Sequence, residues 1–262
     1  MATHAPVLRQ RIFEARYEQG YRYLDRCGDA LVILENLLSE QTSHVWLPHE
    51  ANPTSARLQC PDLDVTIVFN SYSMIVDQQI VSDALLDFAH LAATTLATLT
   101  GRFDLRAMRR FGYRRVHILA AASDSIDDAE RLSLTIAPDQ SWFHPPAPEL
   151  APRSFEQATL YEQSDRAKGL RVTTKPYAKI GTDLHVDERL NAPPHHFPKE
   201  QRTALIEQLK RAKARQHDPE AGVSIDLDFY YLWPPKTLSI PDFVQEATKT
   251  ADEALAQVIG RT

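Results

Sequence analysis

The most regular alternation of hydrophobic and polar residues in the chain lies at 222–232, in the run GVSIDLDFYYL. Hydrophobic residues occupy the odd positions from Val223 to Tyr231, and the even positions between them hold Ser224, Asp226, Asp228 and Tyr230. A period of two predicts a β-strand with one buried face. The open face of this strand carries two carboxylates, Asp226 and Asp228, roughly 7 Å apart along the strand.

The same kind of pattern predicts a chain that is rich in strands. Alternating residues predict strands at 11–24, 56–60, 63–72, 112–120, 132–136, 154–162, 169–177 and 182–189. Hydrophobic residues at helical spacing predict helices at 29–39, 80–99, 198–216 and 240–259. Because strands often follow one another, we expect an α+β fold, with mostly antiparallel sheets and long helices packed on one face. In each half of the chain strands precede a long helix, an order that is consistent with two similar halves.

Proline divides the chain near its middle. Residues 138–153 contain five prolines, a composition that predicts an extended connection. We therefore expect an N-terminal α+β half over 1–137 and a C-terminal α+β half over 154–262.

The composition limits the class of protein. A net charge of −6 disfavours sequence-independent phosphate binding over the whole surface, and the small number of glycines, 8 in 262 residues, disfavours phosphate loops and a dinucleotide fold. The only two cysteines, Cys27 and Cys60, have no CxxC spacing, which favours a reduced compartment. The chain has neither a signal-peptide core at its start nor a run of about 18 apolar residues, so we expect a cytoplasmic protein without membrane contact.

Acidic residues and histidines suggest one possible site. Asp183, His185 and Asp187 share one face of the predicted strand 182–189, and this face would meet Asp226 and Asp228 if the two strands were neighbours. Carboxylates and imidazole suit a divalent metal, which can activate water for phosphoester hydrolysis. His195, in a proline-rich loop, is a further candidate base or ligand. The catalytic candidates are thus Asp226, Asp228, His185 and His195, with Asp226, Asp228 and His185 as metal ligands. The alternative is that both polar faces are the solvent side of an antiparallel sheet and hold no metal.

A basic run suggests a second site. Arginine alternates with aromatic residues in RRFGYRRVHIL, and this pattern is suited to an anionic ligand or to single-stranded nucleic acid, with candidate residues Arg110, Tyr113, Arg114 and Arg115. We expect Arg115 and His117 on the open face of this strand and Arg114 nearer the core. An arginine in that environment should pair with a carboxylate, for which Asp226 and Asp228 are the candidates.

The sequence also resembles a known family. RRFGYRRVHIL at 109–119 and the late strand IDLDFYYL at 225–232, followed by a C-terminal helix, are similar to a sporadically distributed bacterial family of conserved hypothetical proteins of about this length. The resemblance implies the fold and a bacterial cytosolic origin, and it implies no mechanism.

No GxSxG, HExxH or SxxK motif occurs in the chain. We therefore expect a non-enzymatic accessory or regulatory protein without a cofactor, which binds a protein partner and forms a homodimer. The aromatic and proline residues of 230–235 are of the types enriched at interfaces. The alternatives are a metal-dependent hydrolase or nuclease, and a protein that binds single-stranded nucleic acid through its arginine-rich strand.

Overall fold

The protein is built around one antiparallel sheet of nine strands, in a computed structural model that describes residues 5–18, 26–79, 87–137, 152–179 and 219–260. The strand order is β2-β3-β4-β5-β1-β6-β9-β8-β7. The strands are β1 (Val7–Glu18), β2 (Leu47–Asn52), β3 (Ser55–Cys60), β4 (Val65–Asn70), β5 (Ser73–Gln79), β6 (Arg106–Ala120), β7 (Gln157–Glu162), β8 (Lys168–Ala178) and β9 (Ala221–Leu232). The described helices are α1 (Cys27–Thr42), α2 (Phe88–Phe103), α3 (Ile126–Thr135) and α5 (Ile240–Ile259), with a short 3₁₀ turn at Pro61–Leu63.

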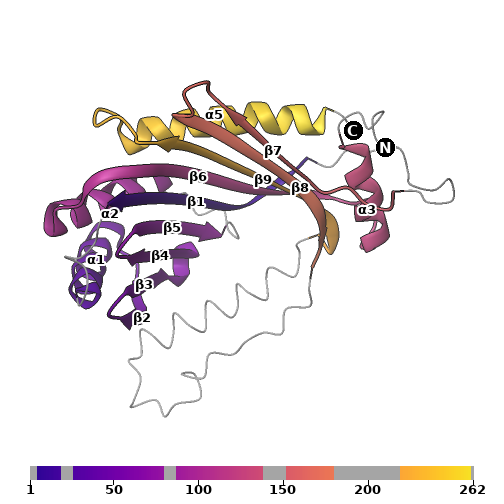
Figure 1. The fold of residues 1–262 in the computed structure, drawn as a ribbon. Helices are drawn as coiled ribbons and strands as arrows, with labels where there is room; N and C mark the ends of the chain where they lie inside the picture. The colour runs from indigo at the N-terminus through magenta and orange to yellow at the C-terminus, as the bar shows by residue number, and fades with distance from the viewer. Residues whose placement is uncertain (1–4, 19–25, 80–86, 138–151, 180–218, 261–262) are drawn as a thin grey trace, which may run out of the picture.

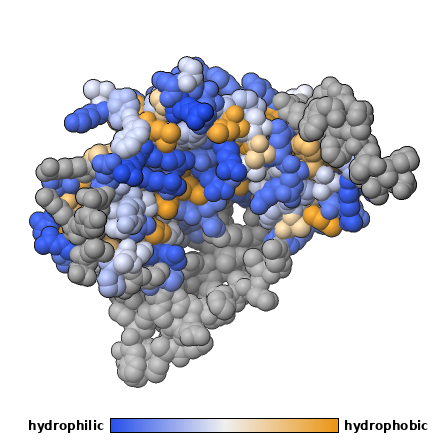
Figure 2. Space-filling model, in the orientation of Figure 1, coloured by the Kyte–Doolittle hydropathy of each residue, from blue (hydrophilic) through white to orange (hydrophobic). Residues whose placement is uncertain are grey.

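The helices pack on one face of the sheet, as the α+β prediction requires. Helix α5 lies along the long strands, with α1 and α2 near one end and α3 near the other (Figure 1). The ring of Phe243 in α5 lies about 6 Å from rings on β1, β6 and β9, namely Phe13, Phe111, Phe229 and Tyr231. Because the apolar side of α5 is turned to the sheet, mostly hydrophilic residues cover its outer surface, with smaller hydrophobic patches between them (Figure 2).

The predicted strand at 222–232 is confirmed as β9, between β6 and β8. Its odd-numbered hydrophobic residues are buried in the helix-covered face of the sheet, from Val223 to Phe229. The even-numbered residues, among them Asp226 and Asp228, point to the opposite face, which we call the open face. Gly222 allows close pairing with β6, because a Cβ atom there would lie 2.2 Å from the carbonyl oxygen of Leu119.

The strand predicted at 132–136 is wrong, since these residues lie in or just after helix α3. Ser125 caps the helix by accepting a hydrogen bond from the Asp127 amide, and acidic residues follow in the first turn, where the helix dipole favours them. Ala129 and Ser133 are buried four residues apart, and Ile136 follows three residues later. A run of five residues is too short to separate this helical spacing from alternation.

Strands from both predicted halves belong to the same sheet. β6 and β9 pair without a break from Arg110↔Leu232 to Ala120↔Gly222. No helix in the described part of the chain is both long and apolar enough to cross a membrane. The strand predicted at 182–189 and the helix predicted at 198–216 lie outside the described residues.

Candidate site on the open face of the sheet

A groove with a volume of about 550 Å³ and with both charged and apolar lining residues lies on the open face of the sheet. Six strands line this groove. Its lining residues are Ile12, Glu14 and Arg16 of β1, Arg57 and Gln59 of β3, Thr66 and Val68 of β4, Ile75 and Asp77 of β5, Arg110, Gly112 and Arg114 of β6, and Asp228 of β9. The groove is therefore formed by residues that lie far apart in the sequence.

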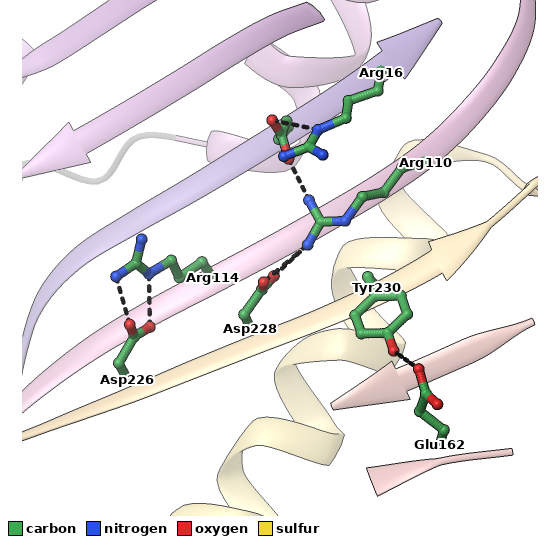
Figure 3. A network of polar contacts seen from close by, with 8 residues as sticks. Arg16, Arg110, Arg114, Glu162, Asp226, Asp228 and Tyr230 are labelled. Carbon is green, nitrogen blue, oxygen red and sulfur yellow. Dashed lines mark hydrogen bonds and ion pairs between the residues drawn. The ribbon is translucent and has the colours of Figure 1, made fainter. Parts of the chain in front are cut away.

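Arg110 is the centre of a network of ion pairs that crosses three strands (Figure 3). Its Nη2 donates to both carboxylate oxygens of Asp228, at 2.8 and 2.9 Å, and its Nη1 donates to Glu14. Glu14 also accepts a hydrogen bond from Nε of Arg16 at 2.9 Å. These contacts hold the charged side chains of β1, β6 and β9 in fixed positions.

A second ion pair joins Arg114 to Asp226, one of the two pairings predicted from the sequence. Arg114 Nε donates to Oδ1 at 2.7 Å and Nη2 donates to Oδ2 at 2.5 Å, a two-pronged geometry that fixes both planar groups (Figure 3). The environment differs from the prediction, because the Arg114 side chain is 47% exposed on the open face.

The predicted orientation of this arginine-rich strand is wrong. Arg115 and His117 belong to the helix-covered face, where Arg115 Nη1 donates to Asp252 of α5 at 2.6 Å and His117 is buried. Phe111 and Tyr113 set this orientation, because they share the parity of Arg115 and are buried under the helices. The hydrophobic residues, and not the arginines, thus decide which face each position takes.

Gly112 and Gly169 make room for two of the polar side chains on the open face. A Cβ atom at Gly112 would lie 2.2 Å from Nη1 of Arg110, and one at Gly169 would lie 2.6 Å from the hydroxyl of Tyr230. The Arg110 guanidinium lies 5.4 Å from the centre of the Tyr230 ring, which suits a cation–π contact. The Tyr230 hydroxyl donates to Glu162 (Figure 3), and burial together with this hydrogen bond raises the pKa of Tyr230 to about 12.

Burial raises the pKa of two acidic residues that line the groove. It raises the pKa of Asp228 above its ordinary value, although the neighbouring Arg110 opposes the shift. It also raises the pKa of Asp77, whose Oδ1 accepts a hydrogen bond from Gln10 Nε2 at 2.8 Å. Both carboxyl groups therefore take up a proton more readily than an exposed aspartate does.

The wall formed by β3 and β4 was not predicted from the sequence. Its polar residues are Arg57, Gln59 and Thr66. Alternation with the buried residues Ala56 and Leu58 is enough to place Arg57 on the open face, but it says nothing about which other strands lie near. The strand order of the sheet brings this wall to the groove.

The predicted site residues do not share one surface. Arg110 and Arg114 line the groove, whereas Arg115 lies on the other face and Tyr113 is buried, its ring centre 6.0 Å from that of Phe88. The aromatic residues of the arginine-rich strand are therefore not available to stack on nucleic acid bases.

The predicted metal site is only partly described by the structure. His185 and His195 lie outside the described residues, as do Asp183 and Asp187. Among the residues that are described, no group of three or more His, Cys, Asp or Glu side chains could hold a metal ion. Both oxygens of Asp226 and of Asp228 accept hydrogen bonds from arginine.

No protein-family model and no curated protein matches the chain in the comparisons with known proteins. The resemblance to a bacterial family of hypothetical proteins thus stays a prediction. The groove on the open face, with its charges and its shape, is the feature from which a function can be inferred.

Proposed function

We propose that the protein acts by binding, as an accessory or regulatory component, and that its ligand enters the groove on the open face of the sheet. The ion-pair network of Arg110 is the observation that carries this proposal, because it holds charged side chains ready in a groove of about 550 Å³. Grooves of roughly 300 to 1,000 Å³ accommodate small-molecule ligands.

The state of the carboxylates supports binding over catalysis. A general base needs an oxygen that can accept a proton from the substrate, and a metal ligand needs an oxygen that faces the ion. Arginine occupies both oxygens of Asp226 and of Asp228. These carboxylates therefore serve to orient Arg110 and Arg114.

Fixed side chains favour binding for an entropic reason. An arginine that is already held by two carboxylates loses little conformational freedom when a ligand arrives, so less of the interaction energy is spent on ordering it. Arg110 is held in this way, between Glu14 and Asp228. A bacterial and cytoplasmic setting is part of the same proposal. The scarcity of cysteine supports the reduced compartment.

Gly112→Leu tests the proposal by filling the groove. The new side chain would displace the Arg110 guanidinium, which lies directly over this glycine, and would take up space in the groove. Thermal unfolding is measured with a panel of amino acids, nucleotides, sugar phosphates and dicarboxylic acids. We expect at least one compound to raise the melting temperature of the wild-type protein and to leave that of Gly112→Leu unchanged.

Gly101→Ala is the matched control, because a Cβ atom at this position of α2 meets nothing within 4 Å. The control variant should respond to the same compounds as the wild-type protein. The proposal is contradicted if no compound stabilises the wild-type protein, or if the compounds stabilise Gly112→Leu equally. The melting temperature of each variant without ligand shows whether it is folded.

A further inference from the structure

Arg57 differs from the other arginines of the groove. Arg16, Arg110 and Arg114 each contact a carboxylate, whereas Nε of Arg57 is buried without a hydrogen-bond partner among the described residues. A buried donor that lacks an acceptor destabilises the protein, and this penalty is largest for a charged group. The same guanidinium lines the groove, where its positive charge would attract an acceptor that a ligand brings.

The residues beside Arg57 are also suited to an anionic group. Gln59 lies two positions along the same strand, on the same face, and Thr66 is its partner on β4. The amide of Gln59 and the hydroxyl of Thr66 are hydrogen-bond donors, and this wall carries no carboxylate among its lining residues on β3 and β4. One cation and two neutral donors are the kinds of group that bind an oxyanion, with the carboxyl of Asp77, on β5, next to Thr66.

The floor of the groove is apolar between this wall and the ion-pair network. Val68 is the partner of Arg57 on β4, and Ile75 is the partner of Val68 on β5. Ile12 of β1 lines the same groove. A hydrophobic part of a ligand would be buried against these three side chains.

The carboxylates of the groove limit the number of anionic groups in the ligand. Asp77 pairs with Ile12 of β1 on one side and with Thr66 of β4 on the other, so its carboxyl lies within the groove and next to the donors of the β3–β4 wall. The carboxylates of Asp228 and Asp226, both on β9, are already paired with Arg110 and Arg114. A second anionic group on the ligand would approach these carboxylates and be repelled.

We propose that the groove binds a small amphipathic anion, whose single carboxylate or phosphate group contacts Arg57, Gln59 and Thr66 and whose apolar part lies on Ile12, Val68 and Ile75. This inference rests on the proposed binding function and specifies the chemical class of the ligand. It assigns the role of anion-binding residue to Arg57.

Calorimetric titration with three related compounds tests the inference. Benzoate and phenyl phosphate carry the anionic group as a carboxylate and as a phosphate, and benzamide has the same ring without a charge. We expect at least one of the two anions to bind the wild-type protein roughly tenfold or more tightly than benzamide, because charge-assisted hydrogen bonds are the stronger kind. The anion that binds more tightly shows whether the site prefers a carboxylate or a phosphate group.

Substitution of Arg57 tests how much its positive charge contributes to binding the anion. Arg57→Gln should lower the affinity for the anion to that for benzamide, and Arg57→Lys should retain part of the difference. Arg131→Gln is the control, because this exposed arginine on α3 lies outside the groove and should leave binding unchanged.

Each outcome of the titrations is informative. If the anion binds Arg57→Gln as tightly as the wild-type protein but does not bind Gly112→Leu, the assignment of Arg57 is wrong and the proposed function stands. If the anion binds Gly112→Leu as well, or does not bind the wild-type protein, the amphipathic-anion inference is overturned. The thermal-unfolding experiment with the wider panel of compounds then tests the proposed function on its own.

Discussion

A single glycine permits the network of ion pairs on the open face. Because Gly112 has no side chain, the guanidinium of Arg110 can lie directly over it. We expect Gly112→Ala to displace Arg110 and to weaken its contacts with Glu14 and Asp228, which should lower the free energy of unfolding by about 1–3 kcal/mol. Chemical denaturation measures this change.

Gly101 provides a control of opposite sign for the same substitution. This residue lies in helix α2 with open space around its Cβ position, so Gly101→Ala should raise the free energy of unfolding by about 0.5–1 kcal/mol. Equal effects at the two positions would contradict the role assigned to Gly112.

The sequence was enough to predict an ion pair between two neighbouring strands. We expected Arg114 to pair with Asp226 or Asp228, because opposite charges on neighbouring strands attract, and it pairs with Asp226. The predicted burial of Arg114 was wrong, since the parity of Phe111 and Tyr113 decides the orientation of the strand. Arg57 was not predicted, because nothing in its own segment indicates that β3 faces the same groove as β6.

The contact between β6 and α5 contains a buried histidine. His117 is 3% exposed, and neither ring nitrogen has a hydrogen-bond partner among the described residues. Burial, with a smaller contribution from Arg115, lowers the pKa of His117 from its ordinary value of 6.5 to about 4. The unfolded chain thus binds a proton at pH values where the folded protein does not.

This difference predicts how stability depends on pH. The contribution of His117 is fully present above pH 6.5 and is lost as the pH falls toward 4, by up to about 3 kcal/mol. His117→Leu removes the titrating group, so the free energy of unfolding of the variant should rise relative to the wild-type protein over this range. Denaturation at several pH values measures the two curves, and parallel curves would refute the prediction.

The elements differ in how far their sequence determines them. α5 was predicted with its observed bounds, because a serine cap and a hydrophobic stripe of five turns agree over 20 residues. α2 continues past the predicted end at residue 99 to Phe103, and Asp104 adopts the left-handed conformation that ends the helix. β5 was not predicted as a separate strand, because the turn before it depends on the side chain of Asn70, which accepts hydrogen bonds from the amides of Tyr72 and Ser73.

At the scale of the whole molecule, the α+β class followed from the sequence and the groove did not. Consecutive strands indicate antiparallel pairing locally, but the groove depends on the order β3-β4-β5-β1-β6-β9. This order joins residues up to 216 positions apart, from Ile12 to Asp228. No local pattern contains that order. The predicted protein partner and homodimer stay predictions, and the groove does not depend on them.

If ligands bind the open face of the sheet, the isoleucine methyl signals of its two faces should respond differently. Ile12 and Ile75 line the groove, whereas Ile67 and Ile225 are buried in the helix-covered face. We therefore choose the anion that binds the wild-type protein more tightly, benzoate or phenyl phosphate, and follow its titration in ¹H–¹³C methyl spectra. We expect the signals of Ile12 and Ile75 to shift while those of Ile67 and Ile225 stay in place. Shifts confined to Ile67 and Ile225, or no shift at Ile12 and Ile75, would contradict binding at the open face.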